Sequence, residues 1–458
     1  MLNFDLTPDQ IDIRNKSRDF ALQEILPIAW HYDEKNEIPL DVLKKAYNAG
    51  ILNADIPKSY GGLGYGLLET ILMVEEISAA CSGIATSIFD NALGAAPLIL
   101  CRNESLKERM LQSLVHEFKL ICFATSEPTM GSDVASLRCL AKEQDGGYLL
   151  NGTKYWVTNG GIADYISVFA TTDPNKGYAG IGAFLVDLHG EGVYRSNPIP
   201  KMGQRGSNTA GISFKNLFFP KENVIAAPGE GFILAMQTFT RTRPAIGAFA
   251  IGAARSAMEF AIDYAKKRRA FRTSLSNFQA TQFKLADMYQ KIETSRLLTW
   301  KAAWEVDSGR DATNAASIAK VYATEAAWEV VNDAMQILGG YGYTRMFPIE
   351  KLLRDIRLLK IYEGTSEIQR LILAGAALNT YQPVMPPLED LAVVSRKTAT
   401  GDDERAEAGT FAWRCRICGN VHYGEEPPDE CPYCFFPKEA FKKVSLKPSG
   451  MDHPDSRQ

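Results

Sequence analysis

The carboxylate of Glu363 lies between an apolar stretch and a glycine, in the last third of the chain. Residues 358–362 before it read Leu-Leu-Lys-Ile-Tyr. Ser366 and Gln369 have the spacing of a capping box, which predicts a helix that begins at Glu367. A carboxylate in a partly desolvated bend before that helix would have a raised pKa and could act as a general base. From these residues alone, a loop glutamate that solvates a helix end is an equally good interpretation.

A second group of reactive side chains lies near the C-terminus, where four cysteines form two Cys-x-x-Cys pairs. Cys415 and Cys418 make the first pair, Cys431 and Cys434 make the second, and twelve residues separate the pairs. Four thiolates on two short loops can enclose one tetrahedral ion, either zinc or iron. This spacing is a strong indication of a metal site. Since four thiolates complete such a site, we interpret the nearby His422 as a surface residue.

Length, charge and composition limit the class of protein. A chain of 458 residues, 46% of them hydrophobic, can form roughly two to four domains with cores of their own. The net charge of −4 argues against a nucleic-acid partner. No N-terminal run has the form of a secretion signal, and no apolar stretch approaches the length of a membrane span. We therefore expect a cytoplasmic protein, in which scattered cysteines are free buried thiols: Cys81, Cys101, Cys122 and Cys139.

Helical patterns fill the first part of the chain, residues 1–117. Thr7 and Gln10 have the spacing of a capping box around Pro8, which predicts a helix that starts near residue 8. Further helical patterns run over residues 40–49, 67–80, 81–100 and 105–115. Asp90 lies inside one of these apolar patterns, where a carboxylate is most often on a solvated face or a satisfied polar group of the core.

Strand patterns follow over residues 118–225. Residues 148–157 alternate in the manner of strands, and we interpret them as a hairpin with Asn151 and Gly152 at its turn. Two further strands, each bounded by Gly, Pro or Asn, are predicted over residues 179–186 and 209–219. We expect this middle region to form a small β-barrel or sandwich.

The helical period returns over residues 226–382. Apolar residues at positions i, i+3, i+4 and i+7 recur over residues 245–267, 279–306, 314–338 and 349–359, which predicts an antiparallel four-helix bundle. Residues 383–410 are rich in proline and charge and are expected to form a linker. The metal domain would cover residues 411–446, before a tail over residues 447–458. The predicted fold class is multi-domain α+β: an N-terminal helical domain, a middle β domain, a helical bundle and a small metal domain.

Several segments together resemble the signatures of the acyl-CoA dehydrogenase family. Those that resemble the second signature are residues 336–343 (Gln-Ile-Leu-Gly-Gly-Tyr-Gly-Tyr), Arg354 with Asp355, and residues 361–370. Residues 126–133, Ser-Glu-Pro-Thr-Met-Gly-Ser-Asp, resemble the first signature. The resemblance spans about residues 1–380 and implies an FAD-dependent enzyme that oxidises an acyl-CoA thioester to a 2-enoyl-CoA.

The resemblance also implies roles for residues near the substrate. In this family the glutamate of the Tyr-Glu-Gly-Thr segment abstracts the α-proton, which makes Glu363 the base. Thr242 occupies a place where some relatives carry an alternative base, and its hydroxyl leaves that role to Glu363. Asp90 lies on a helix that borders the acyl pocket in relatives. A second acidic group there would suit a cyclic or polar acyl chain and could act as a second acid or base. The residues implied to lie at the acyl-CoA itself are Arg243, Tyr362 and Gly364.

Two sets of residues are implied to hold FAD. The first set is Phe123, Ser126, Ser132, Trp156, Thr158 and Thr365. Trp156 would stack on the flavin face opposite the substrate, and Thr158 would bond near N5. The second set is Arg268, Phe271, Gln279, Gln336, Gly339 and Gly340. In relatives, the arginine of this set binds the pyrophosphate, and the residues that match the last three reach the FAD of a neighbouring subunit. This implies a homotetramer built as a dimer of dimers.

The residues around the four cysteines resemble a rubredoxin of the kind fused to rubrerythrins. They include Trp413, Gly419, Tyr423, Pro432 and Phe441. This resemblance favours one redox-active iron over a structural zinc ion. Acyl-CoA dehydrogenases normally pass electrons to an electron-transfer flavoprotein, and a tethered rubredoxin would offer a further exit suited to anaerobic metabolism.

Two alternatives to a dehydrogenase are open at this point. An oxygen-using relative, such as an acyl-CoA oxidase or a flavin monooxygenase, is disfavoured by the intact Glu363 segment and by the iron module. The other alternative is a non-catalytic scaffold for electron carriers that binds flavin or acyl-CoA. Such a scaffold would keep its behaviour after Glu363→Gln, whereas a catalyst would lose turnover.

Overall fold

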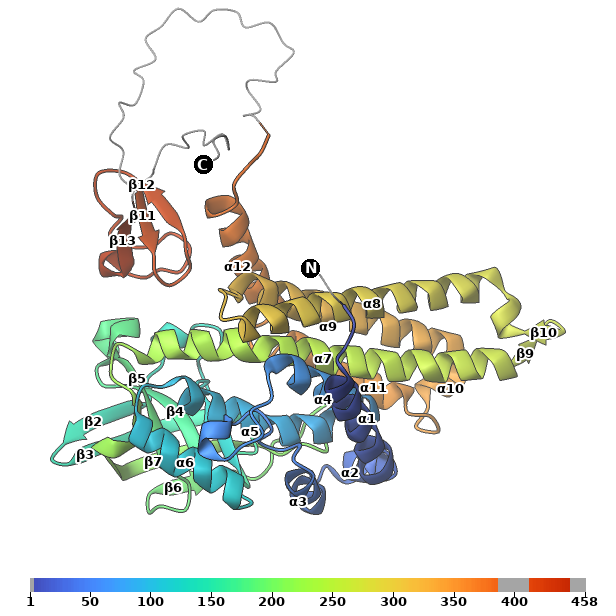
Figure 1. Cartoon of the computed structure of the whole chain (residues 1–458), viewed down its shortest axis with the longest axis horizontal. Helices are drawn as coiled ribbons and strands as arrows, with labels where there is room; N and C mark the ends of the chain where they lie inside the picture. Colours follow the sequence, from blue (N-terminus) through green and yellow to red (C-terminus); the bar gives the residue numbers. More distant parts are fainter. Residues whose placement is uncertain (1–3, 386–411, 445–458) are drawn as a thin grey trace, which may run out of the picture. The chain divides into compact units, whose positions relative to one another are not determined.

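The computed structural model describes residues 4–385 and 412–444, and Figure 1 shows the whole chain. The chain forms two compact units, Met1–Gln369 and Arg370–Gln458. The predicted tail, and all of the predicted linker except residues 383–385, lie outside the described residues.

Six α-helices open the first unit. They are α1 (Pro8–Phe20), α2 (Ala29–Lys35), α3 (Leu40–Asn48), α4 (Leu67–Ala80), α5 (Ser82–Leu100) and α6 (Glu104–His116). The predicted capping box is confirmed, because the Thr7 side chain accepts from the Gln10 N–H and the Gln10 side chain accepts from the Thr7 N–H. Helix α5 lies against the sheet on one side and packs on α4 and α7 (Gly231–Lys267) on the other. Residues of α5 are therefore enclosed between two layers.

The middle of the first unit is a single eight-stranded sheet. Its strands are β1 (Ile121–Ala124), β2 (Leu140–Gln144), β3 (Gly147–Thr158), β4 (Tyr165–Thr171), β5 (Ile181–Asp187), β6 (Val193–Arg195), β7 (Thr209–Pro220) and β8 (Val224–Ala226). The strand order is β6-β7-β3-β2-β4-β5-β8, and β1 pairs in parallel with β4. The predicted strands over residues 179–186 and 209–219 are confirmed as β5 and β7.

The predicted turn at Asn151 and Gly152 is wrong. Residues 147–158 form one continuous strand, β3, and the hairpin turn lies before it, at the Asp145–Gly146 step. Gly152 instead forms a bulge against β7, with φ 139°. A Cβ at this glycine would lie 2.8 Å from the Cα of Cys139, so close packing against the residue just before β2 explains the glycine.

Three long helices, α7, α8 (Gln279–Asp307) and α9 (Thr313–Leu338), run side by side in the second half of the unit (Figure 1). A short hairpin of β9 (Arg269–Ala270) and β10 (Thr273–Ser274) lies between α7 and α8. Three shorter helices follow: α10 (Gly340–Tyr343), α11 (Ile349–Arg357) and α12 (Ser366–Asn379), and the boundary between the two units falls within α12. Helix α7 begins at Gly231, whereas the sequence pattern began it at residue 245. Pro244 lies inside the helix, where buried packing on both sides outweighs its local cost.

Two helices, α5 and α7, are long and apolar enough to span a membrane by length and composition alone. The expectation that no apolar stretch reaches that length is therefore corrected. In both helices most of the apolar window, 78% and 61%, is buried inside the protein, as is usual for helices of a protein core.

In the second unit, a three-stranded antiparallel sheet carries the four paired cysteines. Its strands are β11 (Ala412–Cys415), β12 (Val421–Tyr423) and β13 (Phe441–Val444), in the order β12-β11-β13. Ala412, Phe436 and Phe441 are buried and make up most of its apolar core.

Candidate active site and metal centre

Glu363 lies in a tight left-handed turn. Its φ angle is 57°, and that of Gly364 is 83°. A left-handed conformation costs a non-glycine residue roughly 1–2 kcal/mol, so the surroundings must hold it. The Glu363 carbonyl accepts from Arg243 Nε and Gln369 Nε2, each at 3.3 Å. The Gly364 carbonyl accepts from Gln369 Nε2 at 3.0 Å and from Lys320 Nζ at 2.8 Å. Three side chains from three helices therefore fix the direction in which the Glu363 side chain leaves the backbone.

The Glu363 carboxylate is surrounded by few polar groups. Thr242 Oγ1 donates to its Oε2 atom at 2.9 Å. Burial raises the pKa of Glu363, while the Thr242 hydrogen bond and the charges of Arg243 and Lys320 lower it, and burial has the larger effect. A desolvated carboxylate with a raised pKa is suited to proton abstraction near neutral pH.

The helix after this turn is capped one residue earlier than the sequence indicated. Thr365 Oγ1 accepts from the Ile368 N–H at 3.3 Å, whereas the Ser366 hydroxyl is buried without a partner among the described residues. Gln369 does not close a capping box, because its side chain points back to the carbonyls of Glu363 and Gly364. The predicted capping box at Ser366 is therefore wrong, and its glutamine holds the candidate base instead.

A second carboxyl group, that of Asp90 on α5, lies near enough to Glu363 for their charges to interact. Asp90 is 7% exposed, and its Oδ2 atom has no hydrogen-bond partner among the described residues. Burial, followed by the negative charge of Glu363, raises the pKa of Asp90 well above its usual range. Burial also raises the pKa of the neighbouring Tyr362 hydroxyl. Burial therefore favours the neutral form of both groups.

Around the sheet, several side chains are placed as the FAD resemblance requires. Trp156 is 59% exposed although its φ angle is 61°, so a strained backbone presents an indole to solvent. The hydroxyls of Ser126, Ser132 and Thr158 are accessible and have no protein partner in the part of the chain that the structure describes. Free hydroxyls beside an outward-facing indole fit a flat polar ring. The Phe123 ring is not accessible like these side chains, because it is buried against Phe169 and Phe239.

The remaining FAD candidates lie at the other end of the long helices. Arg268 follows the last residue of α7, whereas Phe239, which contacts Phe123, is near the first turns. At 1.5 Å per residue, the 29 steps from Phe239 to Arg268 span about 44 Å. That separation exceeds the length of one FAD molecule. Phe271 is 92% exposed at the hairpin tip, close to Arg268.

Gly339 and Gly340 also fit a ligand that approaches the backbone closely. Gly339 has φ 59°, and a Cβ at either glycine would meet nothing within 4 Å. Gln336 lies on the last turn of α9 beside them, and Gln279 begins α8. One copy of the chain thus presents two separate groups of candidate FAD residues.

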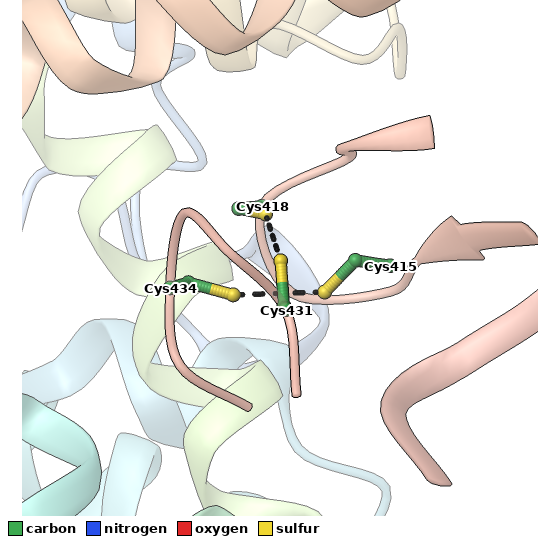
Figure 2. A group of neighbouring side chains, drawn as sticks. All are labelled: Cys415, Cys418, Cys431 and Cys434. Atoms are coloured by element: carbon green, nitrogen blue, oxygen red, sulfur yellow. Dashed lines mark hydrogen bonds between the residues drawn. The ribbon is translucent and has the colours of Figure 1, made fainter. Parts of the chain in front are cut away.

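The four paired cysteines converge on one point, as Figure 2 shows. Cys415 Sγ and Cys434 Sγ are 3.6 Å apart, and so are Cys418 Sγ and Cys431 Sγ. In a tetrahedron with metal–sulfur bonds of about 2.3 Å, the sulfur atoms would be about 3.8 Å apart. The donor set and its spacing therefore fit one tetrahedral zinc or iron ion.

The two cysteine loops have the same backbone design. Cys415 N donates to Asn420 O and Cys431 N to Phe436 O, each at 2.7 Å. The fourth residue after each first cysteine is left-handed: Gly419 with φ 78° and Phe435 with φ 56°. The second loop therefore carries a bulky residue in a conformation that favours glycine.

Sequence reasoning missed Lys320, which lies on α9 and bonds to the turn of the candidate base. It belongs to no motif. The available signal was a lysine within the alanine-rich apolar face of a long helix, where a cation needs a buried partner.

The chain matches family models for three successive parts of acyl-CoA dehydrogenases: the N-terminal domain over residues 7–117, the middle domain over residues 122–217 and the C-terminal domain over residues 229–378. A model of the rubrerythrin, rubredoxin-like domain matches residues 413–442.

Similar proteins are known in bacteria and mammals. The 3-(aryl)acrylate reductase of Clostridium sporogenes is 41% identical over 80% of this chain and 97% of its own length. The mitochondrial short-chain specific acyl-CoA dehydrogenase of Rattus norvegicus is 40% identical over 81% of this chain and 90% of its own.

Two solved structures have the same fold. Butyryl-CoA dehydrogenase from Megasphaera elsdenii has a TM-score of 0.81 and 36% identity, over 82% of this chain and 100% of its own. A chain in the structure of the electron transferring flavoprotein of Acidaminococcus fermentans has a TM-score of 0.81 and 36% identity, over 83% of this chain and 100% of its own. The predicted fold class and enzyme class are confirmed. The chain belongs to the acyl-CoA dehydrogenase family, whose members are FAD-dependent oxidoreductases, and it carries a rubrerythrin-type rubredoxin-like domain in addition.

Proposed function

We propose that this chain removes two hydrogens from the α and β carbons of an acyl-CoA thioester, with Glu363 as the base that takes the α-proton. The observation that carries this proposal is the Glu363 turn, in which a strained backbone and three side chains hold one partly desolvated carboxylate in place. Backbone strain that is maintained around a single carboxylate is typical of a functional group.

The residues around Glu363 would prepare it for this role. Thr242 stabilises the ionised carboxylate by donating to Oε2, and Arg243 and Lys320 add positive charge. When Glu363 accepts the α-proton, its neutral form suits the partly desolvated surroundings, so the transfer relieves the cost of a poorly solvated charge. FAD, when bound, supplies the acceptor for the β-hydride. Ser126, Ser132, Trp156 and Thr158 would hold its ring.

Glu363→Gln tests this function. We expect the variant to lose about a hundredfold to ten-thousandfold in acyl-CoA turnover, since general-base catalysis contributes about 10²–10⁴-fold and no other carboxylate is placed on the same turn. Glu108→Gln, an exposed change on α6, serves as the control. FAD content and thermal stability are measured for both variants. A Glu363→Gln protein that keeps turnover would refute the assignment, and a wild-type protein that binds but never oxidises acyl-CoA would indicate the scaffold alternative.

A second candidate is a dehydrogenase for cyclic or polar acyl-CoA in which Asp90 acts as a second acid or base. The unpartnered Oδ2 of this buried carboxyl favours it, because an enclosed polar atom needs a partner that the substrate could provide. Wild type and Asp90→Asn are compared on straight, branched, aromatic and cyclic acyl-CoAs. If the loss in Asp90→Asn is the same for all of them, Asp90 has no role in selecting the acyl group.

We further propose that electrons leave to an electron-transfer flavoprotein, to the rubredoxin-like domain, or to both. The structural likeness to a chain found with such a flavoprotein supports the first route, and the four converging sulfurs support the second. Iron in the four-cysteine site would give a ferric-thiolate absorbance. Loss of this absorbance after addition of acyl-CoA, with no flavoprotein present, is expected for the second route; an unchanged spectrum would exclude it, as would bound zinc.

The proposed assembly is a homotetramer. About 44 Å of α7 separate Phe239, which contacts Phe123, from Arg268, and this separation supports it, because a second copy could complete each FAD site. Light scattering of the purified protein tests this. A monomer that retains FAD would contradict it.

The free, mostly buried cysteines outside the metal site suit a reducing cytoplasm.

A further inference from the structure

Lys320 on α9 is a cation enclosed by protein. Its side chain is 0% exposed. Among the largest fully buried side chains of the described residues, only Lys154 and Lys320 are charged. Its Nζ atom donates to the Gly364 carbonyl at 2.8 Å, and among the described residues no carboxylate lies within ion-pair distance of it. A buried ammonium group usually has a salt-bridge partner, so its position beside the Glu363 turn needs an explanation.

The turn that Lys320 contacts is closely packed at Gly364. Gly364 has φ 83°, and a Cβ there would lie 2.6 Å from Gln369 Nε2. Its carbonyl accepts from both Gln369 and Lys320, which hold it from two sides. A change of the lysine side chain would therefore be transmitted through the Gly364 carbonyl to Glu363, the residue directly before Gly364.

We propose that Lys320 is a positioning residue for the reaction: its ammonium group fixes the Glu363–Gly364 turn and provides the buried positive charge that keeps the Glu363 carboxylate ionised before substrate arrives. This inference rests on the proposed role of Glu363 and adds a residue to it. The charge acts across the turn, since the lysine bonds to the Gly364 carbonyl and the carboxylate has its hydrogen bond from Thr242.

The charges that face the two groups agree with this role. Burial lowers the pKa of Lys320 to about 8; the negative charges of Glu363, Glu325 and Glu367 raise it, and the positive charge of Arg243 lowers it. Lys320 is thus protonated near pH 7. Glu363 faces the cations Arg243 and Lys320 and the Thr242 hydroxyl, and it also faces the carboxyl group of Asp90, whose pKa burial raises well above its usual range. Lys320 is therefore one of two cations that favour the ionised base, and the one that can lose its proton near pH 8.

Lys320→Met tests the inference, because methionine keeps the length of the side chain but carries no charge. We expect the acid limb of kcat/KM for acyl-CoA to move up by about one pH unit, which is about a tenfold loss one unit below the wild-type limb. Lys320→Arg keeps the charge and is expected to keep the limb. Lys301→Met, on the exposed face of α8, is the control and should behave as wild type. A limb that stays in place in Lys320→Met would overturn the inference, even if overall activity falls.

A second measurement needs no turnover and separates this inference from the proposed function. At about pH 7, an ionised Glu363 without Lys320 would destabilise the fold, so replacing it with neutral glutamine should relieve more cost in the Lys320→Met background. We therefore expect Glu363→Gln to raise Tm more in Lys320→Met than in wild type. Equal changes in both backgrounds would overturn the inference. If wild type oxidises no acyl-CoA, the proposed function fails. The stability cycle still shows whether Lys320 favours the ionised form of Glu363.

Discussion

Replacing Thr242 with valine should raise the pKa of the candidate base. The Thr242 hydroxyl has one proton and two acceptors within reach, Thr238 O at 3.1 Å and Glu363 Oε2 at 2.9 Å. When Glu363 is ionised, the hydroxyl donates to it; when Glu363 is protonated, the hydroxyl can accept from Glu363 and donate to Thr238. The hydroxyl therefore bonds to both forms, but more strongly to the charged one.

The magnitude follows from that difference. A hydrogen bond to a charged group contributes about 1.5–3 kcal/mol, and a neutral one about 0.5–1.5 kcal/mol. Losing the difference of about 1–1.5 kcal/mol favours the protonated carboxyl, so the pKa of Glu363 should rise by about one further unit. Since the base must be ionised, the acid limb of kcat/KM should move to higher pH by the same amount, while the rate well above the limb changes little.

The assay is the pH dependence of acyl-CoA oxidation for Thr242→Val, Thr242→Ser and Thr238→Val. Serine keeps the hydroxyl and should keep the wild-type limb. Thr238→Val is the matched control one turn earlier on α7, because its hydroxyl donates to Leu234 O and does not contact Glu363. A Thr242→Val limb that coincides with those of both controls would refute the reasoning.

Three further outcomes are expected. Gly364→Ala should lower Tm and reduce turnover more than tenfold, because its φ of 83° and the Gln369 amide 2.6 Å away leave no place for a Cβ; unchanged kcat/KM would contradict the account of the turn. Phe435→Gly should stabilise the metal-loaded cysteine domain by about 1 kcal/mol, because glycine relieves the strain of the left-handed conformation at position 435. Gly419→Ala in the equivalent loop should destabilise the domain. Both effects are measured by denaturant titration of the metal absorbance. Removing the metal with a chelator should unfold β11–β13 and change Trp413 fluorescence while acyl-CoA oxidation with an artificial acceptor continues; a domain that stays folded without metal would contradict this.

Much of the fold could be predicted because hydrophobic periodicity is a local property. Helix α4 was predicted with its observed bounds, and α8 and α9 to within one residue at each end. The errors occurred where distant contacts decide the local structure. Gly152 next to Asn151 has the sequence of a hairpin turn, but packing against Cys139 makes it a bulge in a continuous strand.

The candidate site was predicted in part. The position of Glu363 in a bend before a helix is correct, since a glycine and polar residues encode that break. What sequence could not give is the set of side chains that hold the bend. Lys320 and Arg243 reach it from helices 43 and 120 residues away along the chain, a proximity that no local pattern encodes. Gln369 was assigned to a cap, yet it bonds to the carbonyls of the turn.

The claim on which the account depends is that Glu363 removes a proton from the α-carbon. An acyl-CoA with deuterium at both α positions allows a direct measurement, because each α-abstraction releases one deuterium to water. Wild type should release deuterium in step with formation of 2-enoyl-CoA, and Glu363→Gln, folded and loaded with FAD, should release none above background. Deuterium release by Glu363→Gln at the wild-type rate would contradict the account.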